Sequence, residues 1–273
     1  MIRSAVTVSL VPEARGGPFV FWDDLSEACR KAADLGFDAV EVFPPDAGAV
    51  REAGLADLLT RHNLKLAAMG TGGGWVAHRL TLTSGERSVR EQAINFVRSI
   101  IDAAGPMGAP AIIGSMQGRW DGSVSRASAM SSLAEALREL ADHARQYGVP
   151  VVYEPLNRYE TNMANTVEAG IVAINSSGSA NVKLLADLFH MNVEEADIAG
   201  AIRGGKGYIG HVHWADSNRR PAGAGHTDFV PVAAALTEIG YDGYVSAEVL
   251  PYPDPDAAAK LTIDSVRRHF PRG

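Results

Sequence analysis

Short apolar runs that alternate with segments of helical period are the feature that most constrains how this chain folds. Eight such runs, several of them rich in β-branched residues, are spaced so that a helix fits between each pair: 4–10, 38–43, 64–70, 110–114, 150–155, 182–187, 208–214 and 244–250. Strands that alternate with helices favour parallel pairing through right-handed crossovers. Eight such units within 273 residues match a closed (β/α)₈ or TIM barrel.

The segments between these runs carry apolar residues at the three- and four-residue spacing of an amphipathic helix. The first segment ends at Gly36, a residue typical of a helix C-terminus, and its predicted buried face is Leu25, Ala28, Cys29, Ala32 and Leu35. The fourth ends near Gly148, with Leu133, Leu137, Leu140 and Ala144 on its apolar face. The sixth, residues 194–203, is the least regular, because glycines lie within it and at its end.

An open doubly wound sheet is the alternative arrangement of alternating strands and helices. It predicts a phosphate-binding Gly-x-Gly-x-x-Gly turn after the first strand, and Gly16 and Gly17 do not supply that pattern. No Pro/Gly/Ser-rich linker, charge run or low-complexity tract divides the chain. The sequence therefore predicts an α/β fold in which residues 1–273 form one single-domain TIM barrel.

Charge and cysteine content argue against several classes of function. The 25 Lys and Arg against 32 Asp and Glu give a net charge of −7, which argues against nucleic acid as a partner, since phosphate neutralisation needs clustered positive charge. The single cysteine, Cys29, rules out a disulfide framework and a Cys-based zinc site. No run of about 18 apolar residues predicts a membrane span, and the mixed N-terminal segment does not resemble a signal peptide, so we expect a cytoplasmic protein.

Polar side chains end the last four predicted strands, and the carboxyl ends of the strands form the active-site face of such barrels. They are Glu154, Asp187, His213 and Glu248, which follow one another at intervals of 33, 26 and 35 residues, about one strand–helix unit each. Neighbouring strands would bring them to one point near the barrel axis. Three carboxylates and one imidazole, with no thiolate, suit a divalent ion, with Mn²⁺ favoured and Mg²⁺ or Co²⁺ as alternatives.

Sequence motifs in the second half resemble the sugar isomerase/epimerase superfamily of xylose isomerase-like TIM barrels. They are YEPLNRYET (153–161), ADLFHMNVEE (186–195), HVHWADSNRRPAGAGHTDF (211–229) and YVSAEVLP (244–251). Within that superfamily the chain is similar to the ketose 3-epimerases and most similar to 5-keto-L-gluconate epimerases. The latter similarity adds GTG (70–72), LTLT (80–83), IIGSMQGR (112–119) and ADSNR (215–219).

The resemblance also implies roles for individual residues. The metal ligands would be Glu154, Asp187, His213 and Glu248, the same four that the strand ends indicate. Glu154 and Glu248 would also form the acid/base pair. Contacts to substrate oxygens would come from Glu160, His190 and Arg219. The substrate would be a small sugar or keto-sugar acid, and the protein would be a homo-oligomer, a dimer or tetramer.

The chemistry of epimerisation fits this set of residues. Inverting a carbinol carbon next to a ketone requires removal of a carbon-bound proton and its return to the opposite face. A divalent ion acts as a Lewis acid that stabilises the enediolate. Two carboxylates on opposite sides of the carbon then serve as base and acid and exchange roles with the direction of reaction. Glu154 and Glu248, on the fifth and eighth strands, can flank such a substrate.

Other activities on the same scaffold remain open at this point. An aldose–ketose or hydroxypyruvate isomerase, or an inosose dehydratase, would use a similar metal site. An abasic-site endonuclease would need more histidines and a basic face, which the net charge opposes. A glycoside hydrolase would leave Asp187 and His213 without a role, and a sugar-binding module would leave the metal ligands unused.

A few polar residues outside this set carry expectations of their own. Glu41 ends the second predicted strand and is expected in the site or directly behind it. His211 precedes His213 by two residues, so both side chains face the barrel interior, and His211 is expected to pack there rather than bind metal. Asp228 is expected to cap the helix that follows it. Arg119 is a candidate anchor for the carboxylate of an acidic substrate.

Overall fold

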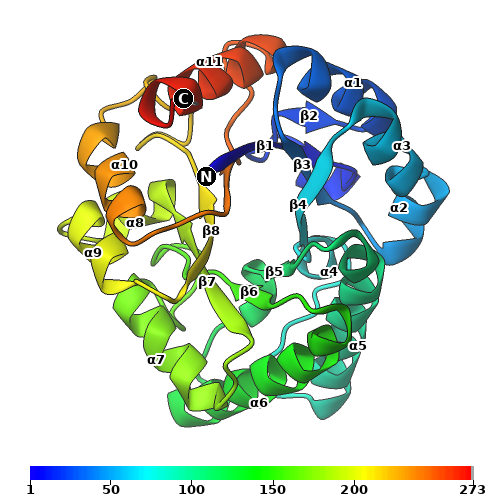
Figure 1. Cartoon of the computed structure of the whole chain (residues 1–273). Helices are drawn as coiled ribbons and strands as arrows, with labels where there is room; N and C mark the ends of the chain where they lie inside the picture. The colour runs from blue at the N-terminus through cyan, green and yellow to red at the C-terminus, as the bar shows by residue number, and fades with distance from the viewer. Residues whose placement is uncertain (272–273) are drawn as a thin grey trace.

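Eight parallel strands form a closed ring in the computed structural model, which describes residues 1–271. Each strand pairs with the next along the chain, and β1 pairs with β9 to close the barrel (Figure 1). The barrel strands are β1 (Arg3–Ser9), β3 (Ala39–Phe43), β4 (Lys65–Gly70), β5 (Ala111–Ile113), β6 (Val151–Tyr153), β7 (Val182–Asp187), β8 (Ile209–His213) and β9 (Tyr244–Ala247). Each of the eight predicted runs overlaps one of them, so the predicted barrel is confirmed.

Helices form an outer ring around the strands (Figure 1). They are α1 (Leu25–Leu35), α2 (Ala47–Glu52), α3 (Leu55–His62), α4 (Gly73–Val76), α5 (Arg87–Ala104), α6 (Arg126–Ala144), α7 (Val167–Ser177), α8 (Leu188–Glu194), α9 (Ile198–Gly204), α10 (Phe229–Glu238) and α11 (Pro255–His269). Short 3₁₀ turns also occur: η1 (Pro12–Ala14), η2 (Gly105–Met107), η3 (Ser115–Gln117) and η4 (Arg145–Tyr147). A two-residue strand, β2 (Phe21–Trp22), pairs with the end of β1.

The helix boundaries follow local capping chemistry. Helix α1 begins after Asp24, whose side chain accepts a hydrogen bond from the backbone of Glu27, and ends at Gly36 in the left-handed region, as predicted. The sixth predicted helix, 194–203, begins later than expected, at Ile198. Helix α8 ends at Glu194, and Asp197 caps a new helix, α9, by accepting from the backbone of Gly200. This cap therefore sets the first turn of α9 after Asp197 rather than at residue 194.

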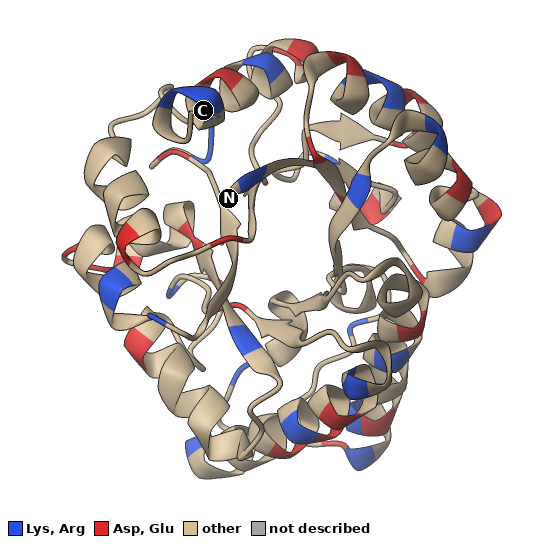
Figure 2. Cartoon of the chain, viewed as in Figure 1, with Lys and Arg blue, Asp and Glu red and all other residues tan. Residues whose placement is uncertain are grey.

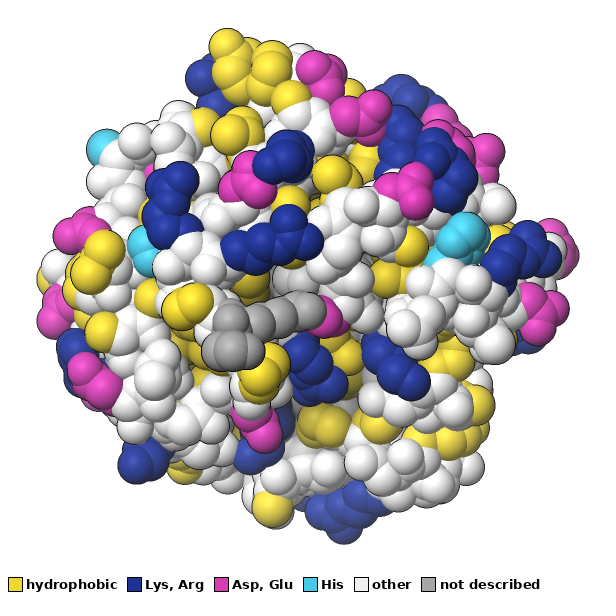
Figure 3. Space-filling view, turned by 45° about the horizontal axis from the view of Figure 1, so that its top comes forward, with side chains coloured by type: hydrophobic (Ala, Val, Ile, Leu, Met, Phe, Trp, Pro, Cys, Tyr) yellow, Lys and Arg dark blue, Asp and Glu magenta, His cyan; other side chains and the backbone are white. Residues whose placement is uncertain are grey.

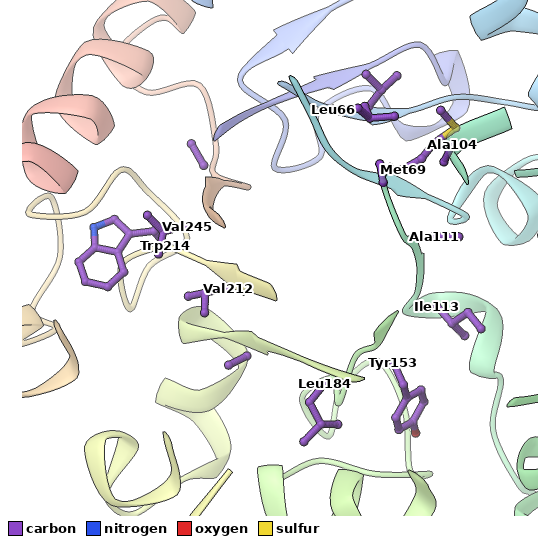
Figure 4. Close-up of a cluster of buried hydrophobic side chains, with 14 of the residues drawn as sticks. Leu66, Met69, Ala104, Ala111, Ile113, Tyr153, Leu184, Val212, Trp214 and Val245 are labelled. Atoms are coloured by element: carbon purple, nitrogen blue, oxygen red, sulfur yellow. The ribbon is translucent and has the colours of Figure 1, made fainter. Parts of the chain in front are cut away.

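Successive strand residues point alternately toward the helices and toward the barrel axis. Ile113, Tyr153 and Leu184 belong to the large apolar layer between strands and helices, part of which Figure 4 shows. Their neighbours Ile112 and Val152 lie in a small separate cluster with Ala68 and Leu185. The inward-facing positions are thus filled partly by apolar side chains. Near the carboxyl ends of the strands, buried polar groups take their place.

Charged side chains lie mainly on the outer helices (Figure 2). On the face shown in Figure 3, cationic and anionic side chains are interspersed rather than gathered by sign. Among the described residues no helix combines the length and apolar character that crossing a bilayer requires.

Candidate active site

Four buried side chains converge at the carboxyl ends of β6 to β9. Glu154 directly follows β6, Asp187 and His213 are the last residues of β7 and β8, and Glu248 directly follows β9. One donor atom from each lies within 4.8 Å of the others. The structure therefore brings together the four residues that the strand ends predicted to be neighbours.

The Nδ1 atom of His213 lies at the centre of this cluster. It is 3.2 Å from Oδ2 of Asp187, 3.3 Å from Oε2 of Glu248 and 3.6 Å from Oε1 of Glu154. Gly114, at the end of β5, makes space for the Glu154 carboxylate, since a Cβ there would lie 2.4 Å from its Oε2 atom. Three carboxylates and one imidazole nitrogen thus face a common point.

Burial makes this concentration of negative charge unfavourable without a compensating cation. Burial raises the pKa of Glu154 well above its usual value; nearby His213 opposes the shift, and the charges of Glu248 and Asp187 add to it. Its Oε1 atom has no hydrogen-bond partner among residues 1–271. This unsatisfied oxygen lies beside two more carboxylates and a histidine nitrogen. Together these atoms form a donor set that fits a hard or borderline divalent cation.

A second group of polar side chains covers the cluster on the side of the open cavity. Arg219 donates a hydrogen bond through Nη2 to Oε2 of Glu248, and its guanidinium lies 4.7 Å from the ring centre of Phe189. The Nη1 atom of Arg219 is 3.4 Å from Nε2 of His190. Oε1 of Glu160 lies 3.8 Å from both Arg219 Nη1 and His190 Nδ1. The three residues expected to contact substrate are therefore neighbours at the rim of the cluster.

Asn157 fixes the orientation of His190. Its side-chain Nδ2 atom is 2.8 Å from Nδ1 of His190 and 3.1 Å from Oε1 of Glu160. Because an amide nitrogen can only donate, Nδ1 of His190 is the acceptor and Nε2 carries the proton. Burial lowers the pKa of His190, which favours this neutral form. No role was predicted for Asn157, although it lies within the motif YEPLNRYET (153–161).

A buried aspartate organises the loop that carries Arg219. The Asp216 carboxylate accepts hydrogen bonds of 2.7–3.0 Å from four backbone N–H groups, those of Ser217, Gly223, Gly225 and Thr227. Its own carbonyl accepts from the backbone of Arg219, whose φ of 58° lies in the left-handed region. Asp216 was also not predicted, but it lies within the quoted motif ADSNR. The position of Arg219 thus depends on a carboxylate that does not reach the site itself.

Comparison with known proteins places this architecture in a family. Residues 29–269 match the model of the xylose isomerase-like TIM barrel family. The chain belongs to this family. Among curated relatives, L-ribulose 3-epimerase of Methylomonas sp. is 31% identical over 85% of this chain and 83% of its own length. The 3-dehydro-D-guloside 4-epimerase of Escherichia coli is 28% identical over 84% of this chain and 88% of its own length.

Solved structures agree with this assignment of the fold. An L-ribulose 3-epimerase superposes with a TM-score of 0.82 at 26% identity and covers 98% of this chain and 94% of its own. A D-allulose 3-epimerase from Methylomonas sp. gives 0.82 at 24% identity over 99% of both chains. Because its curated relatives are epimerases, this xylose isomerase-like barrel is an enzyme of the isomerase class.

Behind the cluster, two residues of this xylose isomerase-like barrel support His213. Glu41 lies at the middle of β3 and not at the end of its strand as predicted. Its Oε1 atom is 3.0 Å from Nε2 of His213, and its Oε2 atom is 2.6 Å from Nε2 of His211. All three side chains are buried. Burial opposes ionisation of Glu41, but the two imidazoles hold its pKa below the usual range. Glu41 and His211 thus lie directly behind the cluster, with the ring of His211 5.5 Å from that of His213.

The remaining predicted residues of this xylose isomerase-like barrel lie outside the cluster. Asp228 caps α10 by accepting from the backbone of Val230, as predicted. A cavity of about 590 Å³ opens over the cluster, and Phe43, Trp75 and Phe189 form part of its wall. Arg119 does not line this cavity; it lines an adjoining one of about 530 Å³.

Proposed function

We propose that this protein is a divalent-metal-dependent epimerase of keto-sugars that inverts a carbon next to the ketone. The observation that carries the proposal is the pair of buried carboxylates, Glu154 and Glu248, on either side of His213. Two carboxylates that face one point from different strands can reach opposite faces of one carbon atom. The similarity to ketose 3-epimerases and to a 4-epimerase of a keto-glycoside supports the same chemistry.

The residues that would hold the cation are Glu154, Asp187, His213 and Glu248. We favour Mn²⁺, with Mg²⁺ and Co²⁺ as alternatives, because three carboxylates and one imidazole suit these ions. When bound, the cation supplies Lewis-acid stabilisation of the negative charge that develops on the substrate oxygens during enolisation. A hydrogen bond fixes the orientation of the Asp187 carboxylate as a ligand. Its Oδ1 atom accepts from the backbone of Phe189, so its Oδ2 atom faces His213 and the proposed cation position.

Glu154 and Glu248 exchange the proton in this proposal. One carboxylate removes the proton from the carbon next to the ketone, and the C–H electron pair becomes part of an enediolate. The other carboxyl group returns a proton to the opposite face of that carbon, which gives the epimer. The two groups exchange these roles in the reverse direction. The reaction needs no external reductant or oxidant in either direction, since it is redox neutral.

Arg219, His190 and Glu160 would position the substrate. The guanidinium of Arg219 already lies against Glu248, so a substrate oxygen that it holds is close to that carboxylate. His190 presents its Nε2–H toward Asp187 and Glu154, from which it is 3.7 and 3.9 Å distant. This donor can hold a hydroxyl of the substrate, and Glu160 can accept a hydrogen bond from another.

Proton NMR in D₂O tests the reaction. The protein loaded with diamagnetic Mg²⁺ would be incubated with a panel of ketoses and 3-keto-glycosides. We expect deuterium at the carbon next to the ketone together with the epimer. Exchange accompanied by formation of an aldose would show an isomerase instead, and absence of exchange with every compound would contradict the proposal.

Two isosteric variants test the assignment of the proton carriers. We expect Glu154→Gln and Glu248→Gln each to lower the exchange rate by about 10²–10⁴-fold, the range for removal of a general acid or base. The matched control is Glu52→Gln on the exposed surface of α2, which should keep the full rate. Full exchange in either active-site variant would rule out the two-carboxylate scheme.

A further inference from the structure

We propose that the preferred substrate is a keto-sugar that carries a second sugar unit, bound in the cavity that adjoins the active site. This inference rests on the proposed epimerase function and adds the class of substrate. The reacting ring would lie over the Glu154–Glu248 cluster, and the second ring would lie between the loops that follow β4, β5 and β6.

The two cavities adjoin. Trp75, Ser115, Leu156 and Glu160 line both of them, and in this proposal the substrate passes between these side chains from one cavity to the other. Each cavity alone, about 590 and 530 Å³, falls within the range of roughly 300–1,000 Å³ that holds an organic ligand of drug size. A single small sugar would leave the adjoining cavity empty. The shape therefore fits a substrate with two units.

Polar side chains line the adjoining cavity. Its hydroxyl groups come from Thr81, Thr83, Ser84 and Ser123. Arg119 is exposed there and makes no hydrogen bond or ion pair within the part of the chain that the structure describes. The hydroxyl protons of Thr83 and Ser123 are already donated to the Gln117 carbonyl and to Asp121, which leaves Arg119, Thr81 and Ser84 as donors for a ligand. These donors fit a ligand with several hydroxyl groups, because each can pair with an oxygen of the ligand.

Aromatic surfaces lie where the second ring would pass. Trp75 is 36% exposed at the passage, and Arg79 lies over its ring at 5.1 Å, which restrains the indole. Tyr159, on the far side, is 78% exposed. Aromatic side chains with an apolar face and a polar edge suit the mixed C–H and O–H surface of a sugar ring.

The charges in the adjoining cavity favour a neutral second unit over a carboxylate. The positive charge of Arg119 shares this cavity with the negative carboxylates of Asp121 and Glu160. Asp121 accepts hydrogen bonds from Ser123 and from the backbone of Val124, and these bonds lower its pKa and keep it charged. A ligand carboxylate would meet two negative groups and one positive group. A neutral glycosyl unit meets donors and acceptors without this repulsion.

The test compares three substrates that share the same reacting ring. They are methyl 3-keto-β-D-glucopyranoside, 3-keto-cellobiose oxidised in the non-reducing ring, and the matching keto-disaccharide whose second unit is glucuronic acid. Solvent deuterium uptake by the Mg²⁺-loaded full-length protein gives kcat/KM for each. We expect kcat/KM for 3-keto-cellobiose to exceed that for the methyl glycoside by at least about tenfold, which corresponds to about 1.4 kcal/mol of additional binding.

Two variants locate the second unit. Ser123→Trp places a large side chain in the adjoining cavity and should remove the preference for the disaccharide while the methyl glycoside keeps its rate within about twofold. Ser131→Trp, on the exposed surface of α6, is the matched control and should keep the preference. Arg119→Ala should reduce it by roughly threefold or more, and Arg138→Ala on α6 should not.

The outcomes separate this proposal from the proposed function. Equal rates for methyl glycoside and disaccharide, or a preference that survives Ser123→Trp, would overturn the second-unit site and leave the epimerase intact. A preference for the disaccharide whose second unit is glucuronic acid, if it depends on Arg119, would assign the adjoining cavity to a carboxylate instead. Absence of exchange with these compounds and with every free ketose would overturn the proposed function, and this inference with it.

Discussion

His213 is held from behind by Glu41: Nε2 of the imidazole is 3.0 Å from Oε1 of that carboxylate, while Nδ1 faces Asp187 at 3.2 Å. Because Glu41 can only accept when ionised, Nε2 of His213 carries a proton, and Nδ1 is the nitrogen that would present its lone pair to a bound cation. A carboxylate that fixes the tautomer of a histidine in this way is a common support of metal sites. Glu41 belongs to β3 and His213 to β8, so the contact crosses the barrel interior.

This contact predicts that Glu41→Gln weakens cation binding by about 10–100-fold. Glutamine has nearly the same shape, but its amide group would place N–H donors against the N–H of one of the two imidazoles. Titration calorimetry with Mn²⁺ measures the change directly, without reference to activity. Glu52→Gln is the matched surface control and should bind as the unchanged protein does. Unchanged affinity in Glu41→Gln would show that the carboxylate does not orient His213.

Removal of the cation should destabilise the protein. A cation at 100 times its Kd contributes about 2.7 kcal/mol to the free energy of unfolding. Each kcal/mol shifts Tm by roughly 2–4 °C in domains of about 150–250 residues, so we expect Mn²⁺ to raise Tm by about 5 °C or more. Glu154→Gln removes a ligand and should reduce this rise, as calorimetric scans with EDTA and with Mn²⁺ would measure. An equal rise in both proteins would exclude Glu154 as a ligand.

Neighbouring arginines provide a matched pair of variants. We expect Arg219→Lys to lower kcat/KM by roughly tenfold or more, because lysine lacks the planar set of donors that lies against Glu248 and the Phe189 ring. Arg220 lies over the ring of Tyr252 at 3.8 Å, away from the cluster. Arg220→Lys should keep kcat/KM within about twofold. Steady-state kinetics on the substrate identified by NMR decide the matter, and similar losses in both variants would count against a specific role for Arg219.

The Asp216 loop predicts a pH-dependent stability. Burial opposes ionisation of Asp216, but the backbone N–H groups that it accepts prevail and lower its pKa. A carboxylate with a lowered pKa in the folded state contributes stability above its unfolded pKa, about 3.9, and loses it as the pH falls through the lower folded value. Asp216→Asn should therefore cost about 1–3 kcal/mol at pH 7 and progressively less below about pH 4.

Urea unfolding at several pH values measures this difference. Asp242→Asn, an exposed aspartate before β9, is the control and should change little at any of them. A loss in Asp216→Asn that stays constant from pH 7 to pH 3 would mean that the carboxylate charge is not what holds the loop. We also expect Asp216→Asn to raise KM, because the same loop positions Arg219.

The barrel and its central cluster could be predicted from the sequence because both depend on local signals. Alternating strands and helices specify the order of pairing, and a polar residue at the end of each of the last four strands then has one possible location. Asp187 and His213, for example, needed only the strand register to become neighbours.

The supporting contacts could not be predicted in the same way. The contact between Glu41 and His213 joins strands far apart in sequence, and its geometry depends on which way both side chains turn inside the barrel. Asp216 resembles any polar loop residue until its four backbone donors are placed around it. The start of α9 at Ile198, later than the predicted residue 194, depends on the Asp197 cap, which the apolar spacing of the segment does not reveal.

Closure of the ring through β1 and β9 has a consequence for synthesis of the chain. Strand β1 is synthesised first and its partner β9 last. At about 5–20 residues per second, one edge of β1 therefore lacks its final partner for roughly 10–50 seconds. The four donors at the strand ends all come from the later half, and Glu248 arrives last. A nascent chain therefore offers a cation an incomplete set of ligands, and the complete site arises only as the ribosome finishes the barrel.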